Sequence, residues 1–99
     1  MTSRKVSLMV NDAPFPVDYF VQSLVDHVTT GIIQALEGTG EANAFDLSIA
    51  QAGVNLKVNG ALVPTNPFVS RVITNTLFGL VSSLKGVGQI NTLKIEIRK

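Results

Sequence analysis

The chain carries one pattern of residues twice, 48 positions apart. The stretch VSLMVNDAPFPVDYFV at residues 6–21 returns as VNLKVNGALVPTNPFV at residues 54–69. Aligned without a gap, residues 6–49 and 54–97 are identical at 14 of 44 positions. A unit of about 45 residues is too small to bury its own apolar face and needs a neighbour to cover it. The repeat therefore predicts a tandem duplication in which two copies of one unit share a single core.

Each unit begins with the signals of a β-hairpin. In VNLKV, residues 54–58, apolar and polar side chains alternate, which is the pattern of a half-buried strand. Asn59 and Gly60 follow, a pair favoured in the tight type I′ turn because both central residues of that turn need positive φ. Asn11 and Asp12 are a weaker version in the first unit. The prolines after each turn predict a short return strand at the edge of a sheet.

A helix follows the hairpin in each unit. Asn66 is suited to cap the helix N-terminus, and Pro67 suits the first helical position, where no N–H is needed. The apolar pattern then runs over residues 68–84 before a glycine ends it, and Asp18 is the corresponding cap in the first unit. A last alternating segment, AFDLSIA in the first unit and TLKIEIRK in the second, predicts a final strand. Each unit is therefore predicted to be β-β-α-β.

These elements predict one domain, residues 1–99, of the α+β class. Two β-β-α-β units give a two-layer sandwich, with a mainly antiparallel sheet and two helices on one of its faces. Two arrangements of the strands stay open. A right-handed crossover places the last strand of a unit beside its own first strand. The short linker at residues 51–53 instead favours a hairpin between the two units.

The composition favours an oligomer. The chain is 45% hydrophobic and only 15% charged, which leaves more apolar surface than one small core can hide. A homodimer is the expected form, and a protein partner is the other way to cover that surface. Because cysteine is absent, disulfides and thiolate metal sites are excluded, and a cytoplasmic protein is expected. No apolar run approaches the roughly 20 residues that a membrane span needs, so no membrane association is expected.

The sequence has only weak candidates for catalytic or ligand-binding motifs. The segments GTG at residues 38–40 and GVG at residues 86–88 follow the C-terminus of each expected helix, where the dipole is negative, so they indicate helix stops and not phosphate loops. His27 is the only histidine, and no nucleophile or further ligand stands at a recognisable spacing from it. A net charge of +1 gives no nucleic-acid footprint. We therefore expect no enzyme, no cofactor, no metal and no nucleic-acid partner.

Charge is divided unequally between the two halves. Residues 1–50 hold two basic and six acidic residues, a balance of −4, whereas residues 51–99 hold six basic residues and one acidic residue, a balance of +5. At equivalent positions, Glu37 is replaced by Lys85. Opposite charge favours pairing of one half with the other over pairing of like halves. The alternative is that the charges of the two halves diverged without any role in pairing.

The helices predict where a partner binds. With about 100° of rotation per residue, Phe20 and Phe68 lie on the arcs expected to face the sheet. The other side of the second helix is also apolar, and we expect it to pack against a second subunit or a protein partner. The expected interface residues are Leu77, Phe78 and Val81, with Ile33 from the first helix. The alternative is that loops of the same chain, or the first helix, cover this side of the second helix.

Gly31 and Gly79 occupy the same mid-helix position in the two units. Glycine there costs about 1 kcal/mol relative to alanine, so a compensating contact is expected. Both glycines fall within the arcs expected to be buried. We therefore predict that the backbone of the sheet or of the other helix approaches them closely.

Two classes of function remain open from the sequence. The first is an interaction or assembly protein, a homo-oligomer whose shared surface is its working part. The second is a small-ligand binding protein or an unorthodox enzyme, with a pocket between the helices or between subunits. The faces expected to be buried offer few convergent polar groups, which favours the first class.

Overall fold

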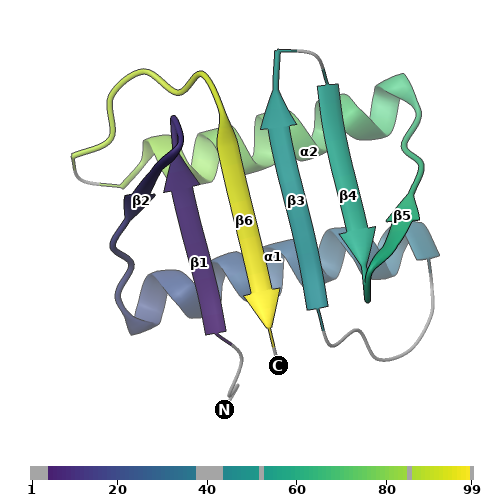
Figure 1. Ribbon diagram of the computed structural model, residues 1–99, viewed down its shortest axis with the longest axis horizontal. Coiled ribbons are helices and arrows are strands. Elements are labelled where there is room, and N and C mark those ends of the chain that lie inside the picture. The colour runs from purple at the N-terminus through teal and green to yellow at the C-terminus, as the bar shows by residue number, and fades with distance from the viewer. Residues whose placement is uncertain (1–4, 38–43, 52, 85, 99) are drawn as a thin grey trace.

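The structure is a computed structural model, and it describes residues 5–37, 44–51, 53–84 and 86–98 (Figure 1). In chain order the elements of these residues are β1 (Lys5–Val10), β2 (Ala13–Phe15), α1 (Tyr19–Glu37), β3 (Ala44–Ala50), β4 (Gly53–Val58), β5 (Ala61–Val63), α2 (Pro67–Ser82) and β6 (Leu93–Arg98). The strands form one antiparallel sheet, and both helices lie behind it in Figure 1. The two-layer α+β fold predicted from the sequence is confirmed.

The strand order of the sheet is β2-β1-β6-β3-β4-β5. β3 and β4 form a hairpin across the linker between the units, and β6 lies between β1 and β3. The other arrangement, with the last strand of a unit beside its own first strand, does not occur. Closing a loop of a few residues costs less conformational entropy than pairing across a helix, which accounts for the hairpin.

The sheet ends on both sides in a very short strand. β2 and β5 have three residues each. Pro14 lies within β2, and Pro64 directly follows β5. Proline offers no N–H to a ladder, so the strands that carry it are confined to sheet edges. The prediction of short return strands at the edges is confirmed.

The pairing register of the sheet repeats with an offset of 48 residues. Leu8 of β1 pairs with Ile95 of β6, and Leu56 of β4 pairs with Leu47 of β3. The same offset relates the β1–β2 ladder to the β4–β5 ladder. In the centre of the sheet, Leu47 pairs with Ile95. The two halves of the sheet therefore have the same pairings on either side of the contact between β3 and β6.

Both hairpin turns have the backbone conformation that their sequences predict. φ is positive at Asn11 (53°) and Asp12 (65°) in the first turn and at Asn59 (52°) and Gly60 (83°) in the second. A type I′ turn requires positive φ at both central residues, and asparagine, aspartate and glycine tolerate it best. α2 ends earlier than predicted, with Ser83 as its C-cap, so Gly86 lies beyond the helix end, although its φ is positive (92°).

The asparagine of each turn also holds the start of a central strand of the other unit. Asn11 Oδ1 accepts hydrogen bonds from the backbone N–H groups of Asn91 (2.6 Å) and Thr92 (3.1 Å). Asn59 Oδ1 accepts one from the N–H of Ala44 at 3.1 Å. The backbone N–H of each asparagine donates in return to the carbonyl of Thr92 or Ala44. The turns therefore connect the two units as well as the two strands of each hairpin.

Both helices begin with the caps that the sequence predicts. Asn66 Oδ1 accepts a hydrogen bond from the N–H of Val69 at 2.8 Å, and Asp18 Oδ1 accepts one from the N–H of Val21 at 2.8 Å. Pro67 occupies the start of α2. Each carboxylate or amide oxygen satisfies a backbone donor that has no partner within the helix.

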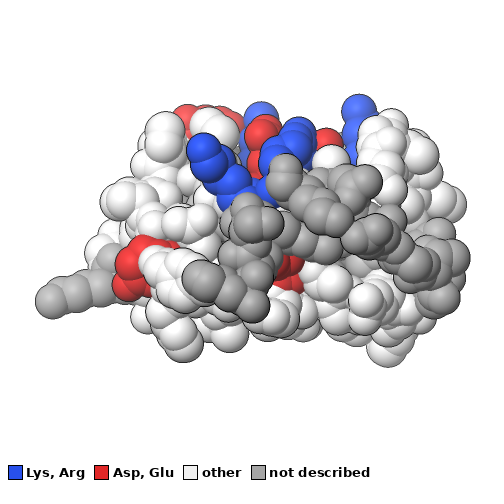
Figure 2. All heavy atoms as spheres, turned by 90° about the horizontal axis from the view of Figure 1, so that it is seen from below, with Lys and Arg blue, Asp and Glu red and all other residues white. Residues whose placement is uncertain are grey.

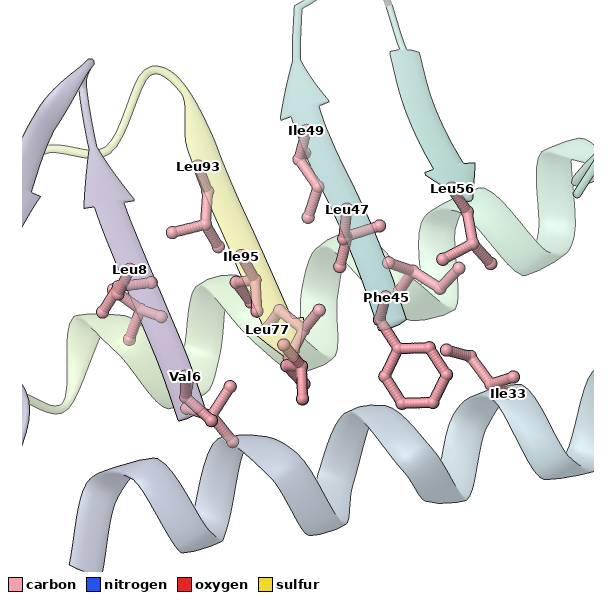
Figure 3. Packing of buried hydrophobic residues seen from close by; sticks show 14 residues of the cluster. Val6, Leu8, Ile33, Phe45, Leu47, Ile49, Leu56, Leu77, Leu93 and Ile95 are labelled. Atoms are coloured by element: carbon pink, nitrogen blue, oxygen red, sulfur yellow. The ribbon is translucent and has the colours of Figure 1, made fainter. Parts of the chain in front are cut away.

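The core lies between the sheet and the helices. Alternate side chains of β3 and β6 point into it, as their sequences predict. In Figure 3 the ring of Phe45 on β3 points toward Ile33 on α1. The buried apolar side chains are Val6, Leu8, Val25, Ile33, Phe45, Leu47, Ile49, Leu56, Ile73, Leu77, Val81, Leu93, Ile95 and Ile97.

The two helices are rotated relative to the prediction. Phe20 and Phe68, expected to face the sheet, are 69% and 71% exposed. Leu77 and Val81, which were expected on the outer side of α2, are buried together with Ile73. α2 has apolar side chains on both sides, so its hydrophobic periodicity is compatible with either side facing the sheet. α1 buries the polar Asp26 and Thr29 on its sheet side, which the apolar pattern of its sequence did not indicate. The helix layer therefore turns its aromatic side toward solvent.

Candidate interaction surface

The outer side of the helix layer carries the main exposed apolar side chains of the described residues. Phe68 lies nine residues, or about half a turn of rotation, from the fully buried Leu77, so it points away from the sheet. We define the outer stripes as Phe20, Leu24 and Gly31 on α1 and Phe68, Val72 and Gly79 on α2. Leu24 is 36% exposed and Val72 38%. The two stripes have the same residue spacing, and both lie on one side of the molecule.

The helices carry almost no charge. Their 19 and 16 residues include only three acidic or basic side chains, those of Asp26, Glu37 and Arg71. In Figure 2 the visible Lys and Arg side chains gather on one side, and the opposite side is mostly uncharged. The charged side is the open face of the sheet, where Lys57, Lys94 and other strand residues are exposed. A solvent-facing helix surface usually carries charged residues, so this one is suited to be covered.

Open space surrounds both mid-helix glycines. A Cβ added at Gly31 or Gly79 meets no atom within 4 Å outside its own helix turn. The predicted close approach of the sheet or of the other helix is therefore wrong for both glycines. The cause is the rotation of the helices, which places the glycines on the outer stripes and not in the core.

The residues predicted to form the interface lie mainly inside the fold. Leu77 and Val81 have no exposed surface, and Ile33 is 5% exposed. Their assignment to an outer face is therefore wrong, because this side of the helices packs on the sheet. Phe78 is half-buried and lines an open hollow of about 480 Å³ together with Ile49, Thr74, Ile90 and other residues. The two most exposed apolar side chains of the described residues, Phe20 and Phe68, are ones that the prediction had placed in the core.

The open face of the sheet carries charges of both signs. Arg98 donates a hydrogen bond to Asp46 Oδ1 at 2.7 Å, which joins the two halves of the chain, and it lies 3.9 Å from Glu96. The hydrogen bond with Asp46 raises the pKa of Arg98, against a smaller opposing effect of desolvation. A shallow hollow of about 480 Å³ lies over Asp46, Lys57, Lys94 and neighbouring residues. Among the described residues of this face, the basic side chains outnumber the acidic Asp46 and Glu96, so its positive charge is only partly offset. The basic residues are Lys5, Lys57, Lys94 and Arg98.

The space between the helices and the sheet is too small for a metabolite. The cavity there measures about 10 Å³ and is lined by Thr29, Ile32, Ile33, Leu47, Leu56, Ile73 and Leu77. That volume is close to the minimum for one water molecule. The Oγ1 atom of Thr29 is buried there without a hydrogen-bond partner among the described residues. A ligand pocket between the helices, the second possibility from the sequence, has no room at this position.

The remaining polar residues of α1 are structural or exposed. Asp26 is only 5% exposed, and it accepts a hydrogen bond from Thr30 Oγ1 at 3.0 Å. His27 is exposed, and its Nδ1 lies 2.8 Å from the carbonyl oxygen of Ser23. The first glycine segment, residues 38–40, and Lys85 lie outside the described residues.

No family model matches the chain, and comparisons with curated proteins and with solved structures return no match either. Among the residues that the structure describes, neither helix combines the length and apolar character needed to cross a bilayer. No three His, Asp or Glu side chains gather in this part of the chain in a way that suits a metal ion. The function is therefore inferred from the surfaces described above.

Proposed function

We propose that the chain is an assembly protein, and that its helix layer packs against the helix layer of a second copy to form a homodimer. The observation that carries the proposal is the pair of outer stripes, on which Phe20 and Phe68 are about 70% exposed. Large exposed apolar side chains on a surface with few charged residues are typical of protein interfaces, and Arg71 is the one Lys or Arg of the two helices. The working surface is thus on the outer side of the helices, with residues different from those expected from the sequence.

The helix layer is large enough for a stable dimer. The molecule measures 35 × 33 × 18 Å, and the helices cover one of its two broad faces. A stable interface needs about 800 Å² from each partner, and a face of these dimensions offers that area. Stacking two such thin molecules gives a sheet-helix-helix-sheet sandwich, in which both sides of each helix are covered.

A second copy suits this surface better than a lipid surface does. A helix that lies on a membrane usually carries Lys and Arg along its polar face. The two helices here have one basic residue among the described side chains, Arg71. A symmetric dimer places the same patch on both subunits, so a patch with a single basic residue meets little repulsion from its own copy.

The repeat supports the same proposal. We propose that residues 6–49 and 54–97 arose by tandem duplication of one β-β-α-β unit. The shared 48-residue offset of the ladders and of the two turn asparagines supports this origin. A duplication places two equivalent apolar stripes on one side of one sheet, which doubles the surface offered to a second copy.

Sedimentation velocity on wild type and a double variant tests the proposal. We expect wild type to be a dimer at micromolar concentration, and Phe20→Lys with Phe68→Lys to be a folded monomer, because neither ring contributes to the core. Leu62→Lys is the matched control, since Leu62 is 62% exposed on β5 but lies outside the helix layer. A monomeric wild type, or a double variant that still dimerises, would contradict the proposal.

A further inference from the structure

Resting on the proposed dimer, we infer that Phe20 and Phe68 of one copy pack onto Gly31 and Gly79 of the other. Each phenylalanine stands 11 residues before the glycine of its own stripe. At about 1.5 Å per residue, a projecting ring and a flat position are about 16 Å apart on the same side of the helix. Each stripe is thus a projection followed by a notch.

The geometry of a symmetric dimer brings projection and notch together. α1 and α2 run in opposite directions across the sheet (Figure 1). When two such layers face each other about a two-fold axis in their plane, α2 meets either α2 or α1 of the other copy in antiparallel orientation. When the axis passes the midpoints of the stripes, the phenylalanine near each helix start lies opposite the mid-helix glycine of the facing helix. The equal spacing of 11 residues in both stripes allows this match for either choice of axis.

Nothing in the described part of the chain requires glycine at position 31 or 79. Their φ angles lie outside the left-handed region, and the space around each is open. Alanine is therefore sterically allowed at both positions and is preferred in a helix by about 1 kcal/mol. Packing of a phenylalanine ring from a second copy against the glycine backbone accounts for glycine at both positions. A buried aromatic side chain in a fitted pocket is a common source of binding energy.

Filling both notches tests the inference. Gly31→Leu with Gly79→Leu should leave the fold intact, since nothing stands within 4 Å, but should weaken dimerisation at least tenfold in sedimentation equilibrium. Gly88→Leu is the matched control, because Gly88 is equally open but lies outside both helices, and dimerisation should not change. If the notch variant dimerises as wild type does while Phe20→Lys with Phe68→Lys is monomeric, the inference is overturned and the proposed function stands. A monomeric wild type overturns both.

Cross-linking gives a second readout that does not depend on how leucine is tolerated. The chain has no cysteine, so introduced pairs are the only thiols. Phe68→Cys with Gly79→Cys should be joined between subunits by a short bifunctional thiol cross-linker if α2 faces α2, and Phe20→Cys with Gly79→Cys if α1 faces α2. A cross-linker is needed because a ring seated on the facing backbone holds the two positions farther apart than a direct disulfide allows. Leu62→Cys with Gly88→Cys should stay uncross-linked. Failure of both test pairs to cross-link a dimeric protein would overturn the inference.

Discussion

Leu47 and Ile95 lie directly opposite each other in the β3–β6 ladder, and their separation of 48 positions is the offset of the sequence repeat. The equivalent residues of the two units thus meet at the centre of the sheet. The strands on either side follow the same pairings outward, from β1 to β2 and from β4 to β5. This arrangement permits a direct test of the equivalence of the two units.

A circular permutant should fold to the same structure. Lys5 and Arg98 are paired at the ends of β1 and β6, just as Gly53 and Ala50 are paired at the ends of β4 and β3. We join residue 99 to residue 1 by a short glycine-serine linker and open the chain in the linker at 51–53. The permutant should show the wild-type far-UV circular dichroism and one cooperative thermal transition. An unfolded permutant would show that the two connections are not equivalent.

Asn11 should contribute to stability through its side chain as well as its backbone. Asn11→Ala removes the acceptor for two backbone donors and places alanine at positive φ, so we expect a loss of about 1 to 3 kcal/mol in urea unfolding. Asn11→Gly keeps the turn conformation and should cost less, though more than zero. If the glycine variant were as stable as wild type, the hydrogen bonds to Asn91 and Thr92 would contribute nothing.

The rotation of α2 can be measured by comparing its two sides. Leu77→Ala removes a side chain with no exposed surface and should cost about 2 to 5 kcal/mol. Phe68→Ala should change the unfolding free energy of the dilute protein by less than about 0.5 kcal/mol, because the ring lies outside the core. Urea denaturation at low protein concentration measures both. The reverse order of effects would restore the helix orientation predicted from the sequence.

Thr29→Val should stabilise the chain. The Thr29 hydroxyl is buried without a hydrogen-bond partner in the described structure, beside a cavity of about 10 Å³. Replacing it with a methyl group of similar shape removes a desolvated polar group, so we expect a gain of about 1 kcal/mol, seen as a higher Tm. Thr29→Ser keeps the hydroxyl and loses the methyl group, and it should lower the Tm. A lower Tm for the valine variant would indicate that the hydroxyl has a partner in solution.

The ion pair of Asp46 and Arg98 should have a small, salt-dependent effect. Both side chains are partly exposed, so Asp46→Asn should destabilise slightly in low salt and less in high salt. The pKa of Arg98 is raised by this contact, so the charge of Arg98 persists at every pH below the ordinary arginine value and is lost only in stronger alkali. Thermal unfolding between pH 6 and pH 9 should therefore show no step from Arg98.

Local signals in the sequence predicted the elements well. The Asn59-Gly60 turn, the Asn66 and Asp18 caps and the alternating strands depend on residues a few positions apart, and the structure has all of them. The strand order was not predictable, because a hairpin and a crossover pairing both satisfied the same pattern. That choice depends on loop length and on contacts between distant strands.

The candidate surface was predictable in kind but not in position. The excess of apolar residues indicated an exposed patch, and Phe20 and Leu77 both belonged to suitable stripes. Periodicity gives the angle between two apolar stripes and not which of them faces the sheet. The scarcity of charged residues on both helices was a signal that neither side is an ordinary solvent face, and it made the assignment from the sequence ambiguous.

The short edge strands limit how copies of this chain can associate. β2 and β5 present three residues each, with Pro14 and Pro64 at or beside them, so they offer a poor template for adding strands from another molecule. Growth of the sheet into an indefinite ribbon is therefore disfavoured at both ends. The proposed contact through the helix layer would then end at a closed pair and would not propagate into filaments.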